Sequence, residues 1–395
     1  SVLRFHPWIF SGAIASFSAP VEDGDLVSVV DSKGRPLGTG HFGGGSIAVR
    51  LLSFDAEEVI DRAFYKRRLE AALRLRLSCD LVRPVGSSDS PNTTYRLVHG
   101  EGDSLPGLII DIYDRTAVVQ AHSLGMHQAR QTIAEVLWEV FAEAGDPVLS
   151  LEGIYYKSET TLPTRDMREL ASDGFLIGHT EAAPIYENGV RFTPDWLKGQ
   201  KTGFFIDQRD NRALVAHYAK GRTVLNAFCY TGGFSIYALH AGAKRVDSLD
   251  SSAKAMYLTE QHVALNFGTD CPRHHSVTED AFDYLERMPE GEYDLIILDP
   301  PAFAKHRKVL RNALIGYRKI NSIAFKKVAP GGIVFTFSCS QAVSKEEFRL
   351  AVFTAAAASG RKVRILHQLT QPVDHPINIY HPEGEYLKGL VLYVE

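Results

Sequence analysis

The chain has 395 residues, of which 45% are hydrophobic and 23% charged; this is a globular composition, and the chain is too long for one ordinary core. No apolar run approaches the ~20 residues that span a bilayer, and no charged-then-apolar leader opens the chain, so neither membrane insertion nor export is expected. The formal net charge of −4 argues against a protein that coats nucleic acid in bulk. Any RNA contact is expected through a local basic surface or with a small, shape-defined substrate.

The four cysteines, Cys79, Cys229, Cys271 and Cys339, lie far apart in the sequence and form no CxxC pair. This spacing disfavours a zinc knuckle and a disulfide framework, and no metal site is expected. A reducing cytoplasm is the simplest location for such a chain.

The N-terminal half is expected to hold a small β-rich domain followed by an α+β domain. Short strands joined by glycine-containing turns favour a small barrel, and they are expected over 26–31, 37–40 and 47–52. Between residues 56 and 77 apolar side chains recur near helical spacing, so a helix follows. The next elements expected are strands over 108–113, 117–122 and 153–156 and one long helix near 125–144.

From about residue 203 the pattern alternates between nearly continuous apolar strands and helices. That alternation predicts an α/β domain whose doubly wound, Rossmann-like parallel sheet is covered on both faces. The expected strands are 223–228, 245–250, 293–299, 332–338 and 363–368, and the expected helices are 233–241, 253–267, 281–288, 309–328 and 345–359. Three domains follow: a β-barrel over 1–55, an α+β middle domain over 56–185 and the α/β domain over 186–395.

The first strand of the α/β domain leads into the turn Thr231-Gly232-Gly233, which has neither the dinucleotide nor the P-loop glycine pattern. Because glycine lacks a Cβ, a ligand can approach such a turn closely; a simple tight turn is the alternative. Asp250 ends the next strand, where an acid can accept hydrogen bonds from ribose hydroxyls. Asp280 precedes a helix and is either a further ligand contact or only the helix N-cap. A glycine turn and two acids in this order favour a phosphate-free cofactor that joins adenosine to an amino acid, S-adenosylmethionine.

Ahead of the sheet, the run 203–212 combines aromatic and polar residues. Either Asp207 caps a helix there, or Gln208 and Arg209 close over the cofactor and Arg209 pairs with its carboxylate. The full set of expected cofactor-binding residues is Gln208, Arg209, Asn226, Phe228, Tyr230, Thr231, Gly232, Asp250, Ser251, Asp280 and Asp299.

Two of the apolar strands end in reactive side chains, Asp299 and Cys339. The carboxyl ends of parallel strands meet at one edge, where open α/β sheets have their sites. A thiolate that adds to carbon 6 of a pyrimidine makes carbon 5 nucleophilic enough to take a methyl group, while an acid bonds the N3 edge of the ring. Cys339 is therefore the expected nucleophile and Asp299 the expected acid. The alternative for Cys339 is a free cysteine that only packs, which is the interpretation preferred for Cys229.

The residues after Asp299 are the expected contacts to the substrate base. Pro300 and Pro301 stiffen the turn and give the base an apolar lip, and Phe303 is expected to stack on it. A basic run, 305–308, follows directly. Such a run is usually a solvated face, but beside the site it suits phosphate contact, and Lys305 is the preferred candidate.

These motifs resemble those of a known family. The run 226–235, the Asp-Pro-Pro motif at Asp299 and the Ser-Cys-Ser motif at Cys339 resemble ribosomal RNA large-subunit methyltransferases that make 5-methylcytosine in 23S rRNA. The run 6–14, with the strand 47–52, is similar to that family's N-terminal PUA domain, an RNA-binding β-barrel, and the middle block is similar to its linker domain.

The resemblance covers the whole chain. It implies a class I methyltransferase fold, S-adenosylmethionine as cofactor, Cys339 as nucleophile and Asp299 as acid. The expected partner is naked or partly assembled 23S rRNA, and a homodimer is left open.

Two departures from related patterns affect the choice of base. A second kind of cytosine methyltransferase carries another cysteine at the Asp-Pro-Pro motif; this chain has none, so another base must remove the carbon-5 proton. Uridine carbon-5 methyltransferases share both motifs but usually continue with Asn-Pro, where this chain has Ser340-Gln341. Cytosine is therefore favoured. The alternatives are a methyltransferase for uridine carbon 5 or a guanine nitrogen, and a non-catalytic RNA-binding assembly factor.

Overall fold

The computed structural model describes residues 2–86, 90–145, 149–163, 172–304 and 306–395. Contacts within the chain divide it into two compact units. Unit 1 comprises Ser1–Gly189, Thr193–Ile206 and Val373–Gly384, and unit 2 comprises Val190–Phe192, Asp207–Pro372 and Glu385–Glu395. In the described part of the chain, no helix is both long and apolar enough to cross a bilayer.

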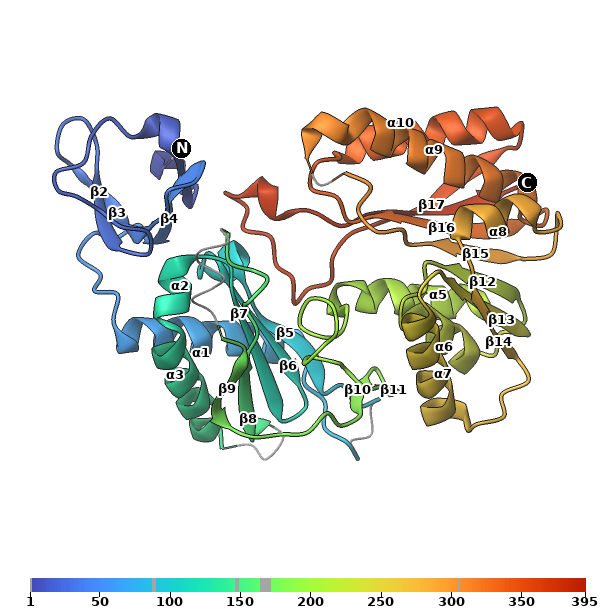
Figure 1. Ribbon diagram of the computed structural model, residues 1–395, viewed down its shortest axis with the longest axis horizontal. Helices are drawn as coiled ribbons and strands as arrows, with labels where there is room; N and C mark the ends of the chain where they lie inside the picture. Colours follow the sequence, from blue (N-terminus) through green and yellow to red (C-terminus); the bar gives the residue numbers. More distant parts are fainter. Residues whose placement is uncertain (1, 87–89, 146–148, 164–171, 305) are drawn as a thin grey trace. The chain divides into compact units, whose positions relative to one another are not determined.

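Unit 1 contains a four-stranded antiparallel sheet in the order β1-β4-β3-β2 and a five-stranded sheet in the order β5-β6-β7-β8-β9 (Figure 1). The helices α1 and α3 pack on each other and cover the larger sheet with fully buried apolar side chains such as Phe64 and Leu137. The long helix expected over 125–144 is divided at Ala129 into α2 and α3. The elements of unit 1 are β1 (Trp8–Phe10), β2 (Leu26–Val30), β3 (Pro36–Phe42), β4 (Ile47–Ser53), α1 (Arg62–Ser78), β5 (Thr94–His99), β6 (Leu108–Tyr113), β7 (Thr116–Ala121), α2 (Leu124–Gln128), α3 (Arg130–Glu143), β8 (Gly153–Tyr156), β9 (Gly174–Gly178) and β10 (Ile185–Glu187).

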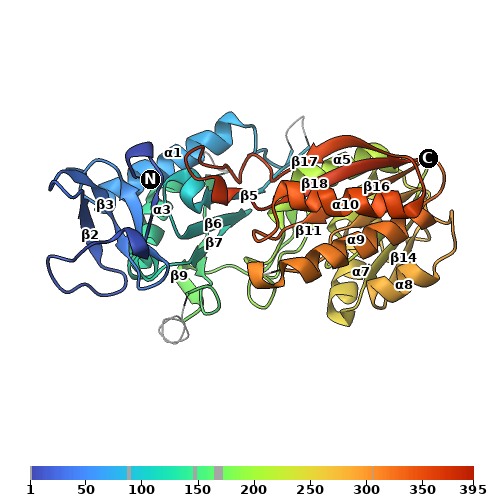
Figure 2. The same cartoon turned by 90° about the horizontal axis from the view of Figure 1, so that it is seen from above.

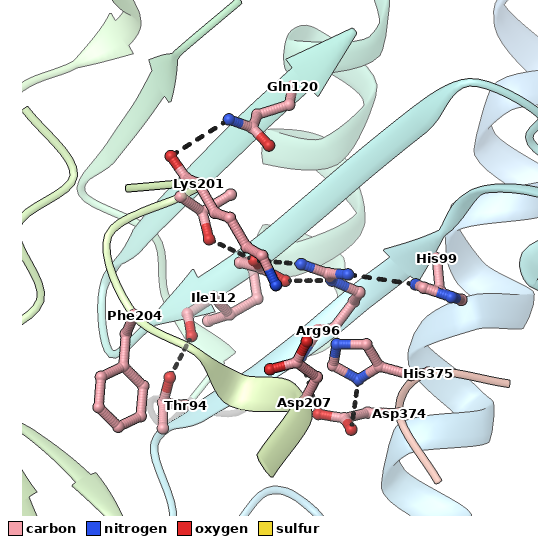
Figure 3. A network of polar contacts seen from close by, with 12 residues as sticks. Thr94, Arg96, His99, Ile112, Gln120, Lys201, Phe204, Asp207, Asp374 and His375 are labelled. Carbon is pink, nitrogen blue, oxygen red and sulfur yellow. Dashed lines mark hydrogen bonds and ion pairs between the residues drawn. The ribbon is translucent and has the colours of Figure 1, made fainter. Parts of the chain in front are cut away.

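A buried polar network ties Val373–Gly384, a segment late in the sequence, to the larger sheet of unit 1 (Figure 3). Asp374 accepts a hydrogen bond from the backbone N–H of Arg96 on β5 at 3.0 Å, and His375 Nδ1 lies 3.0 Å from the Asp374 carboxylate. The Arg96 guanidinium in turn lies 3.2 Å from His99 Nδ1. Burial holds the pKa of His99 well below its usual value, so this ring is neutral.

The ion pair between Arg76 and Asp103 lies in the same network and carries a stability prediction. The Arg76 side chain is fully buried and donates to Asp103 Oδ2 at 2.8 Å and to the carbonyl of Asp374 at 2.9 Å. Asp103→Ala leaves this guanidinium buried without its carboxylate and is expected to destabilise unit 1 by about 3–5 kcal/mol. All three tryptophans of the chain belong to unit 1, so urea unfolding followed by tryptophan fluorescence measures the effect.

The matched control is Glu135→Ala, because Glu135 lies in α3, pairs with Arg62 on the surface and has a side chain that is 48% exposed. This variant is expected to lose less than about 1 kcal/mol. Equal shifts of the two unfolding midpoints would contradict the assigned importance of the buried pair.

Unit 2 is built on a seven-stranded sheet in the order β14-β13-β12-β15-β16-β18-β17. Figure 1 and Figure 2 show α9 and α10 side by side over this sheet, and Figure 1 shows α6 and α7 on its other face. Both faces are thus covered, which explains why every residue of β15 and β16 is buried. The elements of unit 2 are β11 (Val190–Phe192), α5 (Arg209–Ala219), β12 (Thr223–Ala227), α6 (Gly233–His240), β13 (Arg245–Asp250), α7 (Ala253–Phe267), β14 (His274–Thr278), α8 (Ala281–Arg287), β15 (Leu295–Leu298), α9 (Leu310–Lys327), β16 (Gly332–Ser338), α10 (Lys345–Ser359), β17 (Val363–Leu369) and β18 (Lys388–Val394).

The sheet is mixed, and the prediction of a wholly parallel sheet is wrong at β18. This strand runs antiparallel to both β16 and β17, between which it lies. The strands β14, β13, β12, β15 and β16 are parallel to one another, as predicted. Their carboxyl ends therefore meet at one edge of the sheet, and the amino end of β18 lies at the same edge.

Candidate active site

The loop after β12 is held in an uncommon backbone conformation. Phe228, Tyr230 and Gly232 all have positive φ angles, of 58°, 49° and 76°. Two of these are non-glycine residues, for which this region is disfavoured, and such conformations concentrate at functional sites. At Gly232 a Cβ would lie 2.6 Å from Thr259 Cγ2 on α7, so the close approach of α7 requires glycine here. Thr259 Oγ1 also donates to the Tyr230 carbonyl at 3.0 Å.

The end of β13 supports this loop through Asp250. One carboxylate oxygen accepts from the backbone N–H of Tyr230 at 3.0 Å, and the other accepts from that of Ser252 at 2.9 Å. A carboxylate oxygen can accept more than one hydrogen bond, so Asp250 keeps capacity for ribose hydroxyls. Ser251 lies beside it and is exposed.

Two of the predicted cofactor residues have structural roles in the described contacts. Asp280 is exposed and caps α8, accepting from the backbone N–H groups of Phe282 and Asp283 at 2.8 and 3.2 Å. Thr231 is buried, and its carbonyl lies 2.9 Å from His262 Nδ1 on α7. Cys229 is also buried and its Sγ lies 3.6 Å from Met256 Sδ, which confirms its packing role. Burial raises the pKa of this thiol far above its usual value.

The run before α5 joins the site through Gln208. Its Nε2 donates to Asp299 Oδ2 at 3.0 Å, and its Oε1 accepts from Asn211 Nδ2 at 2.7 Å. Arg209 is 1% exposed, and its Nε lies 3.5 Å from Asp210. Gln208 therefore links the amino end of α5 to the carboxyl end of β15.

Cys339 follows β16 directly and is half-buried, whereas its two neighbours are fixed in the protein. Ser338 Oγ donates to Tyr317 OH on α9 at 2.9 Å. Ser340 Oγ donates to the carbonyl of Ala304 at 2.5 Å. The thiol is thus held on a short segment anchored on both sides, and it is not packed into the core.

The structure brings Cys339 and Asp299 to neighbouring strand ends. The strands β15 and β16 pair in parallel up to Leu298 and Thr336, so both reactive residues lie just past the paired region. Burial raises the pKa of Tyr317 to about 12, and a negative charge on Cys339 or Asp299 would raise this pKa as well. Cys339 and Asp299 therefore follow neighbouring strands at the same edge of the sheet.

The predicted substrate contacts differ in exposure. Pro300 is buried, Pro301 is exposed, and Phe303 is half-buried in an aromatic row with Phe282 and Tyr317, at ring-centroid distances of 6.2 and 4.7 Å. Lys305 lies outside the described residues.

Sequence reasoning missed two residues of this edge, Tyr317 and Lys388. Lys388 begins β18 opposite Ser338, and its ammonium donates to the carbonyl of Ser340 at 2.5 Å. A single lysine at the start of an apolar run is the only sign of it in the sequence. Tyr317 gives no comparable sign, because an aromatic residue in an amphipathic helix is usually a core residue.

The polar side chains at the end of β12 fit S-adenosylmethionine. Asn226 is fully buried; its Nδ2 donates to Ser235 Oγ at 2.9 Å, while its Oδ1 has no partner among the described residues. A buried oxygen without a donor costs roughly 1–3 kcal/mol, so a donor on a bound molecule would stabilise this arrangement. With Asp250 on the next strand, these hydrogen-bond acceptors suit the amino group and the ribose hydroxyls of that cofactor.

Comparisons with known proteins agree with this assignment. Residues 164–380 match an S-adenosylmethionine-dependent methyltransferase family, and residues 1–54 match a PUA-like domain. Ribosomal RNA large subunit methyltransferase I of Aeromonas salmonicida is 40% identical over 398 residues, which cover 99% of this chain and 96% of that protein. The protein of the same name from Shewanella denitrificans is also 40% identical, with the same coverage of both chains.

Solved structures show the same fold. An S-adenosylmethionine-dependent methyltransferase from Streptococcus mutans has a TM-score of 0.82 at 23% identity, covering 100% of this chain and 96% of that one. The structure of SMU.776, a methyltransferase in complex with SAH, also has a TM-score of 0.82, covering 97% of that chain. The predicted class I methyltransferase fold with an N-terminal PUA-like domain is confirmed, as is the dependence on S-adenosylmethionine. The chain belongs to the ribosomal RNA large subunit methyltransferase I family.

Proposed function

We propose that this protein methylates carbon 5 of a cytosine in 23S rRNA, with Cys339 as the nucleophile. The observation that supports this most directly is a half-buried thiol after β16, next to the strand that Asp299 follows, at the edge of the sheet that carries the loop after β12. A methyltransferase that acts on a guanine nitrogen needs no thiol, since that atom already carries a lone pair. A uracil ring would accept the same thiol addition, so the base is decided by experiment.

The mechanism assigns one task to each side chain. The Cys339 thiolate forms a bond to carbon 6, and the electron pair of the carbon 5–carbon 6 double bond moves toward N3, where Asp299 donates a proton. Carbon 5 then takes the methyl group, which S-adenosylmethionine supplies as a sulfonium methyl. A base removes the carbon-5 proton, and the electron pair that this releases re-forms the carbon 5–carbon 6 double bond and expels the Cys339 thiolate. The proton on N3 returns to Asp299, so the enzyme is regenerated.

The remaining predicted residues hold the reactants. Asp299 is proposed to lie at the reactive end of the cofactor. The other residues proposed to bind the cofactor are Gln208, Arg209, Asn226, Phe228, Tyr230, Thr231, Gly232, Asp250, Ser251 and Asp280. The residues proposed to contact the nucleotide are Pro300, Pro301, Phe303 and Lys305. The base must leave its stack before the thiol can reach carbon 6, and unpaired loops cost least to open.

The proposed partner is 23S rRNA before complete assembly, met in the cytoplasm. The family relatives are named for ribosomal RNA of the large subunit, which is the basis for this substrate. The division into an RNA-binding barrel over 1–55, a middle domain over 56–185 and a catalytic domain over 186–395 belongs to the same proposal. A homodimer is left to measurement of the mass in solution.

The product identifies the reaction. Protein-free 23S rRNA incubated with the enzyme and S-adenosylmethionine is expected to yield 5-methylcytidine after digestion and mass spectrometry, and bisulfite sequencing locates the cytosine. Assembled large subunits, used in parallel, are expected to be poorer substrates. A product of 5-methyluridine or methylguanosine would contradict the cytosine assignment, and failure to bind S-adenosylmethionine in a calorimetric titration would favour a non-catalytic assembly factor.

A further inference from the structure

Lys388 occupies a position where a lysine is unexpected. It is the first residue of β18 and is paired with Ser338 at the carboxyl end of β16. The residue as a whole is only 5% exposed. The rest of β18 is apolar and buried apart from Tyr393. Burying an ammonium group in such surroundings is costly unless it is paired.

The contacts of Lys388 connect the residue after Cys339 to the residues that lead into β18. The ammonium donates to the carbonyl of Ser340 at 2.5 Å and to the carbonyl of Tyr386 at 2.8 Å. Ser340 is also anchored through its hydroxyl to Ala304, so its backbone has little freedom. These bonds fix the residue directly after the thiol.

Two carbonyl groups satisfy hydrogen bonds but do not neutralise a positive charge. Within the part of the chain that the structure describes, no carboxylate forms an ion pair with Lys388. Of the nearby groups that can be negative, the Cys339 thiol favours the ammonium form of Lys388 most, ahead of Glu385 and Glu347.

We propose that Lys388 is a positioning residue for Cys339, which orients the thiol through Ser340 and stabilises its thiolate through the ammonium charge. This inference rests on the proposed function, because it concerns the group assigned there as the nucleophile. The thiolate is the reactive form of a cysteine, and a neighbouring lysine ammonium favours it.

The pH dependence follows from the groups around the pair. Burial lowers the pKa of Lys388 to about 8, while Cys339 and two acids act in the opposite direction. The charge is therefore present below about pH 8 and is lost as the pH rises through that value. The charged or titratable groups on the packed elements are Asp299 after β15, Tyr317 on α9, Lys345 and Glu347 on α10, and Glu385 before β18.

Alkylation of Cys339 by iodoacetamide tests the proposal without RNA. Peptide mass spectrometry separates this cysteine from Cys79, Cys229 and Cys271. In Lys388→Met, the alkylation rate near neutral pH is expected to fall about tenfold, with the pH midpoint shifted upward by about one unit. The wild-type and variant rates are expected to converge well above pH 8, whereas Lys388→Arg keeps the wild-type rate. Lys345→Met, which removes a half-exposed lysine from the same edge, is expected to change the rate less than twofold.

Controls separate this idea from simple misfolding and from the proposed function. Lys388→Met must retain cooperative melting and bind S-adenosylmethionine. If methyl transfer falls in that folded variant while the alkylation profile stays unchanged, Lys388 is only structural and the inference is overturned. Should the variant not fold, the wild-type protein decides alone: an alkylation midpoint at or above the ordinary cysteine value of about 8.5 overturns it. Full methyl transfer by Cys339→Ala would instead reject the proposed function.

Discussion

Cys339→Ala is expected to abolish methyl transfer to RNA, by a factor on the order of 10⁴ or more, because removal of a covalent nucleophile leaves only binding and orientation. The thiol lies on a segment fixed by Ser338 and Ser340 and is half-buried, so loss of one sulfur atom should not disturb the sheet. Calorimetric titration is expected to give an unchanged affinity for S-adenosylmethionine. The rate is measured as transfer of a labelled methyl group to 23S rRNA.

The control for this variant is Cys271→Ala. Cys271 belongs to the same unit and is also partly exposed, but it precedes β14 and lies outside the proposed site. Its replacement is expected to leave the rate within twofold. A Cys339→Ala enzyme with more than a tenth of the wild-type rate would remove the thiol from the mechanism.

A covalent intermediate provides an independent readout. RNA that contains 5-fluorocytosine cannot lose a proton from carbon 5, so the wild-type enzyme is expected to remain bonded to it. The adduct should survive denaturing electrophoresis and depend on both Cys339 and S-adenosylmethionine. An adduct formed equally by Cys339→Ala would indicate a different nucleophile.

The catalytic half of the fold could be predicted because its strands have one dominant pattern. The strand over 245–250 and the helices over 253–267 and 345–359 were predicted with the bounds that the structure gives. Buried parallel strands are continuous apolar runs, and the polar residue that ends each run marks the edge where sites form. This rule places Asp250, Asp299 and Cys339 at strand ends, where the structure has them, while their roles stay predictions.

The predictions that failed concern features that depend on contacts between residues far apart in the sequence. The strand β18 and its pairing with β16 were not predicted. The reason is that the segment before β18, Val373–Gly384, belongs to unit 1, so β18 is separated from the rest of its sheet in the sequence. Nothing local in a sequence states that a segment leaves one unit and returns. Lys388 and Tyr317 were missed for the same reason, since their importance comes from bonds to Ser340 and Ser338 rather than from a motif.

Asp280 was predicted to be either a helix N-cap or a cofactor contact, and the described contacts are compatible with both. Asp280 caps α8, as the simpler interpretation required, and the bonds to Phe282 and Asp283 use one carboxylate oxygen. The second oxygen leaves a ligand role open to test. Sequence spacing alone cannot separate an N-cap from a ligand, because both place an acid between a strand and a helix.

Asp299→Asn is expected to lower the rate of methyl transfer by roughly 10²–10⁴, because the amide cannot give a proton to the N3 edge of the ring. The substitution keeps the shape of the side chain and an oxygen that can accept from Gln208, so the link between α5 and β15 is retained. Binding of S-adenosylmethionine should change little, and the loss should appear in kcat. The control is Asp270→Asn, an exposed acid of the same unit, with a rate expected within twofold of wild type. If Asp299→Asn raised only the KM for RNA while kcat stayed unchanged, Asp299 would be a binding residue, and the thiol would act without an acid on the ring.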